Sequence, residues 1–381
     1  MLKNKIYRYL SSEILKNFIT ILLTFAAIAW VVRAVNFLDL MVVDGYPSSV
    51  YFSYSVLNFP SIMSRFVPLA FLISLIISIS KFERTKEFLI LWTAGIKKIS
   101  IVNSFFIVAV FVTFFQILLT LFVNPFLLNK SRSLLKNTEL TQINSVLKAN
   151  DFSDTFKGVT FYIEEKTSNN ELINIFIKDT SGNLQTIASE GGKSKNSTIF
   201  AKKGFLYNKK LILFDGTIQT LNDENEIKNV QFKKTELSMV NFSTRTITQP
   251  KVQETSSKLL INCLLDQDFN QNIQNCSLTT EYKKEIVQNL SRRIGAPLYI
   301  PLISIIASFL IIYKKEKKYN YLKKYVVFFL AFAVLVFAEI LLKYTGFSLT
   351  NTILYFVTPL VLLIIFYFLL IKNIVYEKIT R

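Results

Sequence analysis

The stretch that decides the fold is ISIVNSFFIVAVFVTFFQILLTLFV, from Ile99 to Val123, which contains no charged residue. A helix needs ~20 apolar residues to cross the ~30 Å hydrocarbon core of a bilayer. Working outward along the chain, the same hydropathy criterion identifies five more such stretches. They are Ile14 to Val35, Phe59 to Ser80, Ile294 to Tyr313, Tyr325 to Leu342, and Ile353 to Ile371. The sequence therefore predicts an α-helical membrane protein with six transmembrane helices.

The composition excludes several classes of function. The 381 residues are 51% hydrophobic and include no histidine, so neither a Ser-His-Asp triad nor a His-based zinc site can form within the chain. Two cysteines are too few for a Cys-rich metal site. The formal net charge of +18 favours an anionic partner. Because much of this charge flanks the apolar stretches, it does not indicate nucleic acid.

Basic residues beside the spans predict the orientation, because Lys and Arg are retained on the cytoplasmic side. They are concentrated before the first span, between the second and third, between the fourth and fifth, and after the sixth, whereas residues 36–58 contain none. We therefore expect both termini in the cytoplasm and the segment between the third and fourth spans outside. A cleaved signal peptide is the alternative for the first span, since Ala27-Ile28-Ala29 fits a cleavage site, but the apolar run continues to Val35.

The polar segment between the third and fourth spans is too long for a loop. We expect three domains: residues 1–129 with three helices, residues 130–285 as an all-β domain, and residues 286–381 with three more helices. Short alternating runs predict strands at Val159 to Ile163, Leu172 to Ile177, Phe205 to Tyr207, Lys210 to Phe214 and Val230 to Phe232. Turn signals separate them at Asn169-Asn170, Ser181-Gly182-Asn183, Gly191-Gly192 and Asp215-Gly216.

This spacing favours a sandwich or jelly roll. The edge or mouth of such a domain binds an extended apolar chain or another sheet, and a closed sandwich without a ligand is the alternative. Cys263 and Cys276 lie in the Asn/Gln-rich stretch before the fourth span. In an oxidising exterior they form a disulfide, and two unpaired thiols are the alternative.

A short amphipathic segment follows the second span. Charged residues fill its first half from Lys81, and the spacing of Phe88, Leu91 and Trp92 predicts a one-sided apolar ridge on a helix over about residues 82–95, ending at Gly95. Such a ridge suits docking into a groove on a partner. A helix lying on the lipid headgroups is the alternative.

The order of these features resembles the LptF/LptG permeases of the lipopolysaccharide export machine, over essentially the whole chain. The second span contains prolines in Phe59-Pro60 and Val67-Pro68-Leu69-Ala70, and Glu87 lies eight residues before Gly95. Arg292-Arg293-Ile294-Gly295-Ala296-Pro297-Leu298 is similar to the family's Arg-Arg-Leu-Ala-x-Pro-Leu entry to the fourth span. Asn36-Phe37-Leu38-Asp39-Leu40, followed by Met41 to Gly45, resembles the LptF branch more closely.

The resemblance implies a subunit of an ABC-type transporter in the bacterial inner membrane that extracts lipopolysaccharide and passes it to an LptC/LptA-like periplasmic bridge. It implies a heterodimer with an LptG-like permease, or an LptF-like one if this chain is the LptG, and an LptB-like ATPase dimer. The chain contains no GxxxxGK[ST] motif, so ATP hydrolysis belongs to that partner. The residues implied in ATPase coupling are Arg84, Glu87, Phe88, Leu91, Trp92 and Gly95. Trp92 and Lys97 depart from the family pattern, which has Arg and a small residue or Ser there.

A cavity that accepts lipid A phosphates needs cations at the depth of the outer leaflet. The candidates are Arg33, Arg65, Lys130, Arg132, Arg292, Arg293 and Lys343, and for each an interfacial anchor is the alternative. Arg65 lies between two prolines whose freed carbonyls we expect it to bind. Glu339 lies four residues before Lys343, which predicts an ion pair on one helical face.

Two other classes of function remain alternatives. A membrane-anchored sensor or assembly factor whose β domain binds a periplasmic protein would give the same pattern. A secondary transporter requires inverted repeats and ionisable residues at the midplane, and the sequence shows no convincing repeat. An enzyme requires a catalytic constellation, and none is found, so we expect no catalytic residue, no metal and no cofactor.

Overall fold

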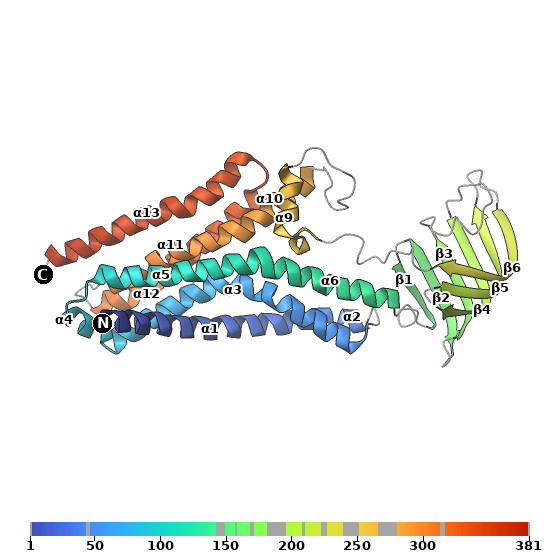
Figure 1. Cartoon of the computed structure of the whole chain (residues 1–381), viewed down its shortest axis with the longest axis horizontal. Coiled ribbons are helices and arrows are strands. Elements are labelled where there is room, and N and C mark those ends of the chain that lie inside the picture. Colours follow the sequence, from blue (N-terminus) through green and yellow to red (C-terminus); the bar gives the residue numbers. More distant parts are fainter. Residues whose placement is uncertain are drawn as a thin grey trace. The chain divides into compact units, whose positions relative to one another are not determined.

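The computed structural model describes residues 2–42, 46–141, 149–156, 158–167, 171–180, 196–207, 210–221, 227–238, 251–265, 280–312 and 317–379. The chain divides into two compact units (Figure 1). The first, which we call the helical unit, comprises residues 1–33, 57–129 and 251–381. The second comprises residues 34–56 and 130–250 and contains the β-sheet.

The described helical elements include seven of 16 residues or more, and shorter helices and turns connect them. They are α1 (Leu2–Phe37), α2 (Asp39–Val42), α3 (Ser48–Arg84), α4 (Glu87–Thr93), α5 (Lys98–Leu118), the π-helix η1 (Leu119–Val123), α6 (Asn124–Thr141), the short 3₁₀ turn η3 (Val252–Glu254), α9 (Ser257–Leu265), α10 (Thr280–Gly295), η4 (Ala296–Leu298), α11 (Tyr299–Ser308), η5 (Phe309–Ile311), α12 (Lys317–Tyr344) and α13 (Leu349–Ile379). Consecutive elements join into continuous rods, as where α5 runs through η1 into α6.

Within the described residues, six helical stretches are long and apolar enough to cross a membrane, which confirms the predicted architecture. They cover residues 5–41, 48–84, 98–135, 280–311, 322–344 and 349–375. Each contains one predicted span, except that the fourth span was predicted to extend two residues further, to Ile312 and Tyr313, and Tyr313 lies outside the described residues. Ile107, Phe111 and Phe368 are more than 60% exposed in this chain. An apolar exterior of this kind suits lipid rather than water.

Prolines within the helices determine how the helical unit is tied together. A proline removes the donor for the carbonyl four residues earlier, and in lipid that carbonyl must find another partner. Five such carbonyls each accept a hydrogen bond from a side chain of a different element. The pairs are Gln116 Nε2 to Ser64 O (3.2 Å, before Pro68), Ser257 Oγ to Leu121 O (2.9 Å, before Pro125), Thr120 Oγ1 to Arg293 O (2.7 Å, before Pro297), Thr113 Oγ1 to Pro297 O (3.4 Å, before Pro301) and Tyr299 Oη to Tyr355 O (3.2 Å, before Pro359).

The prediction that Arg65 binds a carbonyl freed by a neighbouring proline is not what the structure shows for Pro68. The carbonyl freed by Pro68 belongs to Ser64, and Gln116 of α5 donates to it instead. The side-chain amide of Gln116 reaches the Ser64 carbonyl from the neighbouring helix, whereas the Arg65 side chain is exposed.

The second unit contains a sheet of six described strands, each antiparallel to the next in the order β1-β2-β3-β4-β5-β6. They are β1 (Asp151–Phe156), β2 (Val159–Lys166), β3 (Glu171–Asp179), β4 (Asn196–Tyr207), β5 (Lys210–Leu221) and β6 (Ile227–Ser238). The separate β domain is therefore confirmed, although the described strands form one meandering sheet rather than two facing sheets. Phe161, Ile177, Ile199 and Ile218 lie side by side across β2 to β5 and are buried.

The alternation of buried and exposed residues shifts by one position within two of the strands, β3 and β5. In β3, Leu172 is buried and the next buried residue is Ile175, because Asn174 has a left-handed backbone conformation with φ of 50°. Asp215 does the same in β5 with φ of 49°. The turn predicted at Asp215-Gly216 was therefore wrong: both residues lie within a long strand, and the conformation that signals a turn here only shifts the alternation.

Candidate functional site

A cavity of about 320 Å³ lies in the helical unit, and we call it the arginine cavity. It is lined by Ser61, Ser64, Arg65, Pro68, Gln116, Thr120, Asn124, Leu128, Gln253, Asn289, Arg292, Arg293, Ala296 and Glu339. These residues come from α3, the α5–η1–α6 rod, η3, α10, η4 and α12. Three of the predicted phosphate-binding residues, Arg65, Arg292 and Arg293, thus line one cavity although up to 228 positions separate them in the sequence.

Arg293 is built into the protein interior. It is 5% exposed, and its guanidinium donates to Asn289 Oδ1 at 2.8 Å and to Ser257 Oγ at 2.7 Å. It also donates to three backbone carbonyls, those of Val252, Gln253 and Thr255, at 3.2, 3.1 and 3.0 Å. With its donors used in this way, Arg293 holds the segment that leads into α9 against α10. It has a structural task rather than a free charge for a ligand.

Arg292, the preceding residue, is different. Its side chain is 56% exposed, and its Nη2 lies 3.2 Å from Glu339 Oε2 on α12. Among the described residues, this is the ion pair that Glu339 makes, so Glu339 does not pair with Lys343 as its i, i+4 spacing predicted. The contact across two helices replaces the predicted local one, with one guanidinium nitrogen of Arg292 donating to one carboxylate oxygen of Glu339.

Arg65 is the residue that relates this ion pair to Arg33, which is not among the residues that line the described cavity. Arg65 of α3 is exposed and interacts electrostatically with Arg33 of α1, Arg292 and Glu339. Arg33 is exposed as well. Arg65 therefore interacts with two other guanidinium groups and one carboxylate, which leaves an excess of positive charge that an anion would neutralise.

The remaining predicted cations do not line the described cavity. Lys343 is exposed at the end of α12, where its backbone carbonyl accepts a hydrogen bond from Gln288 Nε2 at 2.8 Å. Lys130 and Arg132 lie on the part of α6 that belongs to the second unit. Cys263 of α9 is disulfide-bonded, and Cys276 lies outside the described residues.

The helix α4 is shorter than expected, and its apolar ridge points inward. The preceding helix α3 continues to Arg84, and Lys86 then takes a left-handed conformation with φ of 58° that separates the two helices. Phe88 is 3% exposed and stacks on Trp92 at 5.9 Å between ring centroids. Leu91 and Trp92 pack against the same core. The ridge residues thus attach α4 to the helical unit.

Two other apolar residues of α4 are the ones that face outward. Leu89 is 56% exposed and Ile90 is 63% exposed. Arg84 is exposed too, and Glu87 accepts a hydrogen bond from Thr85 Oγ1 at 2.8 Å. Gly95 has φ of 80°, and a Cβ added there would contact nothing, so its backbone conformation rather than its space requires glycine. The sequence analysis did not single out Leu89 and Ile90, although their place between two inward-facing residues was a signal for them.

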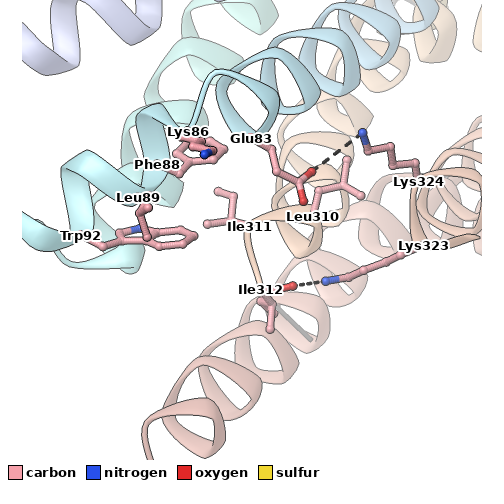
Figure 2. A pocket seen from close by; sticks show the side chains of 10 residues that line it. All are labelled: Glu83, Lys86, Phe88, Leu89, Trp92, Leu310, Ile311, Ile312, Lys323 and Lys324. Atoms are coloured by element: carbon pink, nitrogen blue, oxygen red, sulfur yellow. Dashed lines mark hydrogen bonds and ion pairs between the residues drawn. The ribbon is translucent and has the colours of Figure 1, made fainter. Parts of the chain in front are cut away.

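A second cavity of about 370 Å³, the lysine groove, opens beside α4 (Figure 2). It is lined by Glu83, Lys86, Phe88, Leu89, Trp92, Leu310, Ile311, Ile312, Lys323 and Lys324. Lys324 Nζ lies 3.9 Å from Glu83 Oε2, and Lys323 donates to the backbone carbonyl of Ile312. Among the described residues, no cluster of carboxylate or thiol side chains could hold a metal ion.

The comparisons with known proteins agree with the sequence analysis. The family model described as lipopolysaccharide export system permease LptF/LptG matches residues 8–373 of this chain. Comparison with curated proteins yields no match. The family match spans all six apolar helices and the β-sheet, so it covers both units rather than one of them.

Proposed function

The chain belongs to the LptF/LptG family of lipopolysaccharide export permeases, and on this premise we propose that its arginine cavity takes up the phosphates of lipopolysaccharide. In this proposal the chain is one half of a heterodimeric permease in the bacterial inner membrane. Both termini lie in the cytoplasm, and the β-sheet lies in the periplasm. The basic residues beside the apolar helices support this orientation.

The observation that carries the proposal is that Arg65 and the Arg292–Glu339 ion pair line one cavity, where Arg65 also interacts electrostatically with Arg33. Arginine forks bind phosphate oxygens with two hydrogen bonds each, and they are strongest where water is scarce. Arg292 would exchange its contact with Glu339 for a phosphate of the arriving lipid. Arg293 keeps the wall of the cavity in place during this exchange, because its hydrogen bonds go to protein groups.

The energy for transport comes from a separate ATPase dimer in this proposal. Leu89 and Ile90 of α4 would fit an apolar groove on that partner, while Phe88, Leu91 and Trp92 transmit the force to the helical unit. Their inward packing supports this division of roles. The β-sheet would then pass the acyl chains to a periplasmic bridge of similar sheets.

Site-specific photocrosslinking in living cells tests the proposal. A photoreactive residue at position 65 or 292 is expected to capture lipopolysaccharide. Phe111 provides the control position, because it is 62% exposed on α5 and does not line the described cavity. Capture at 65 and 292 that is no stronger than at 111 would contradict the proposal.

A further inference from the structure

The lysine groove combines an apolar surface with basic side chains, and a single ligand that fills it would contact both. Phe88, Leu89 and Trp92 of α4 and Leu310 and Ile311 of η5 supply an apolar wall. Figure 2 shows Lys323 and Lys324 across from Phe88, Leu89 and Trp92. A small soluble anion would use the lysines and leave the apolar wall in contact with water.

The charge in and near the groove is positive. Three lysines and one glutamate line it. The 3.9 Å separation between Lys324 and Glu83, both more than a third exposed, is a weak ion pair. The groove therefore favours an anionic occupant.

The position of the groove along the helices indicates where that occupant comes from. Three candidate membrane spans end or begin at its edge: one ends at Arg84, one ends at Ile311 and one begins at Leu322. The groove thus lies where helices leave the hydrocarbon and phospholipid headgroups begin. Basic pockets between helices at this level are suited to anionic headgroups, and the apolar wall continues toward the acyl region.

We propose that the lysine groove binds one anionic glycerophospholipid of the surrounding leaflet. Its phosphate lies near Lys86 and Lys324, and one acyl chain runs along Trp92 and Leu310. The lipid bridges α4 to α12, because Lys86 precedes the first residue of α4 and Lys324 belongs to the first turns of α12. The proposal requires only that these helices cross a membrane, and it does not rest on lipopolysaccharide transport.

The test uses the purified full-length chain without its partners, reconstituted with phosphatidylglycerol or with phosphatidylcholine of the same acyl chains. Native mass spectrometry counts the retained lipids. The wild-type chain is expected to retain one phosphatidylglycerol in preference to phosphatidylcholine. In the double variant Lys86→Gln with Lys324→Gln, the preference for phosphatidylglycerol over phosphatidylcholine is expected to be about tenfold smaller. The matched control, Lys178→Gln with Lys202→Gln, removes the same charge from exposed positions on β3 and β4 and should behave like the wild type.

Two results would overturn the inference. One is equal retention of both lipids by the wild type, or an unchanged preference in the groove variant. The other is full competition by soluble glycerol phosphate, which would show that the groove binds a water-soluble anion instead of a lipid. Because the assay contains neither lipopolysaccharide nor ATPase, its failure would leave the photocrosslinking result at positions 65 and 292 unaffected.

Discussion

The arginine cavity lies beside the middle of α3 and the lysine groove at its end, and both gather basic side chains, but they use them differently. Residues 65 and 83 of α3 are about 27 Å apart along the helix axis at ~1.5 Å per residue. In the cavity, guanidinium groups bridge elements through several directed hydrogen bonds. In the groove, ammonium groups surround an apolar wall. The role of a basic residue near the end of a membrane span therefore depends on which groups accept its hydrogen bonds.

The sharpest form of this comparison is within the cavity, between Arg292 and Arg293. The two are neighbours in sequence and side chains of the same chemistry, yet one is 5% exposed with five hydrogen bonds and the other is open. Successive residues on a helix point about 100° apart, so only one of them can face the segment that leads into α9.

The largest effect is expected for Arg293→Met. The substitution leaves the carbonyls of Val252, Gln253 and Thr255 without this donor, and an unsatisfied buried polar group costs about 1–3 kcal/mol. We expect a loss of at least about 3 kcal/mol in the free energy of unfolding, measured in detergent by thermal or denaturant unfolding. The neighbouring variant Arg292→Met is the control and should stay within about 1 kcal/mol, because its ion pair is exposed. Equal destabilisation by the two variants would break the distinction between them.

A smaller effect is expected for α4, which carries both inward-facing and outward-facing apolar residues. Leu89→Ala with Ile90→Ala should reduce co-purification of the proposed ATPase partner about tenfold while leaving the unfolding temperature unchanged, because both residues are exposed. Leu91→Ala should instead lower the unfolding temperature, since Leu91 packs against the core. If the double variant retained its ATPase while the Leu91 variant lost it at full stability, the assignment of the two faces would be reversed.

The smallest effect is expected for an exposed carboxylate of the sheet, Glu236, in contrast to the buried Arg293. Hydrogen bonds from Lys210 and then from Lys234 lower the pKa of Glu236. A lowered folded-state pKa stabilises the fold above the pKa of the unfolded carboxyl, and this stabilisation disappears as the pH falls through the lowered value. Glu236→Gln should therefore lose slightly less stability than the wild type between pH 7 and pH 3, as measured by the unfolding temperature. A steeper acid dependence in the variant would contradict this sign.

The sheet shows why local patterns predicted its existence better than its extent. The alternation of apolar residues predicted short strands such as Lys210 to Phe214, whereas β5 continues to Leu221. Asp215 and Gly216 are turn formers in isolation, but β4 and β6 pair with residues on both sides of them. At Gly216 an added Cβ would lie 2.2 Å from the backbone oxygen of Phe200 and 2.4 Å from the Phe232 ring. Glycine is present there for close approach of the neighbouring strands.

The helix α4 shows the same limit at the candidate site. The spacing of Phe88, Leu91 and Trp92 identified an apolar face, and that face is real. Periodicity does not state whether such a face covers the chain's own core or a partner. Likewise, the i, i+4 spacing of Glu339 and Lys343 predicted a local pair, but Arg292 came within 3.2 Å from another helix.

By itself, the sequence determined the six spans, the separate β domain and the family, because transfer of apolar residues into a bilayer is nearly additive along a segment and needs no knowledge of its neighbours. Only the tertiary structure decided which donor serves each carbonyl freed by a proline, and which of two adjacent arginines became structural. Thr120 and Arg293 are 173 positions apart, yet Thr120 Oγ1 donates to the Arg293 carbonyl at 2.7 Å. Hydrogen bonds are directional and short, so their partners are fixed only when the helices have packed.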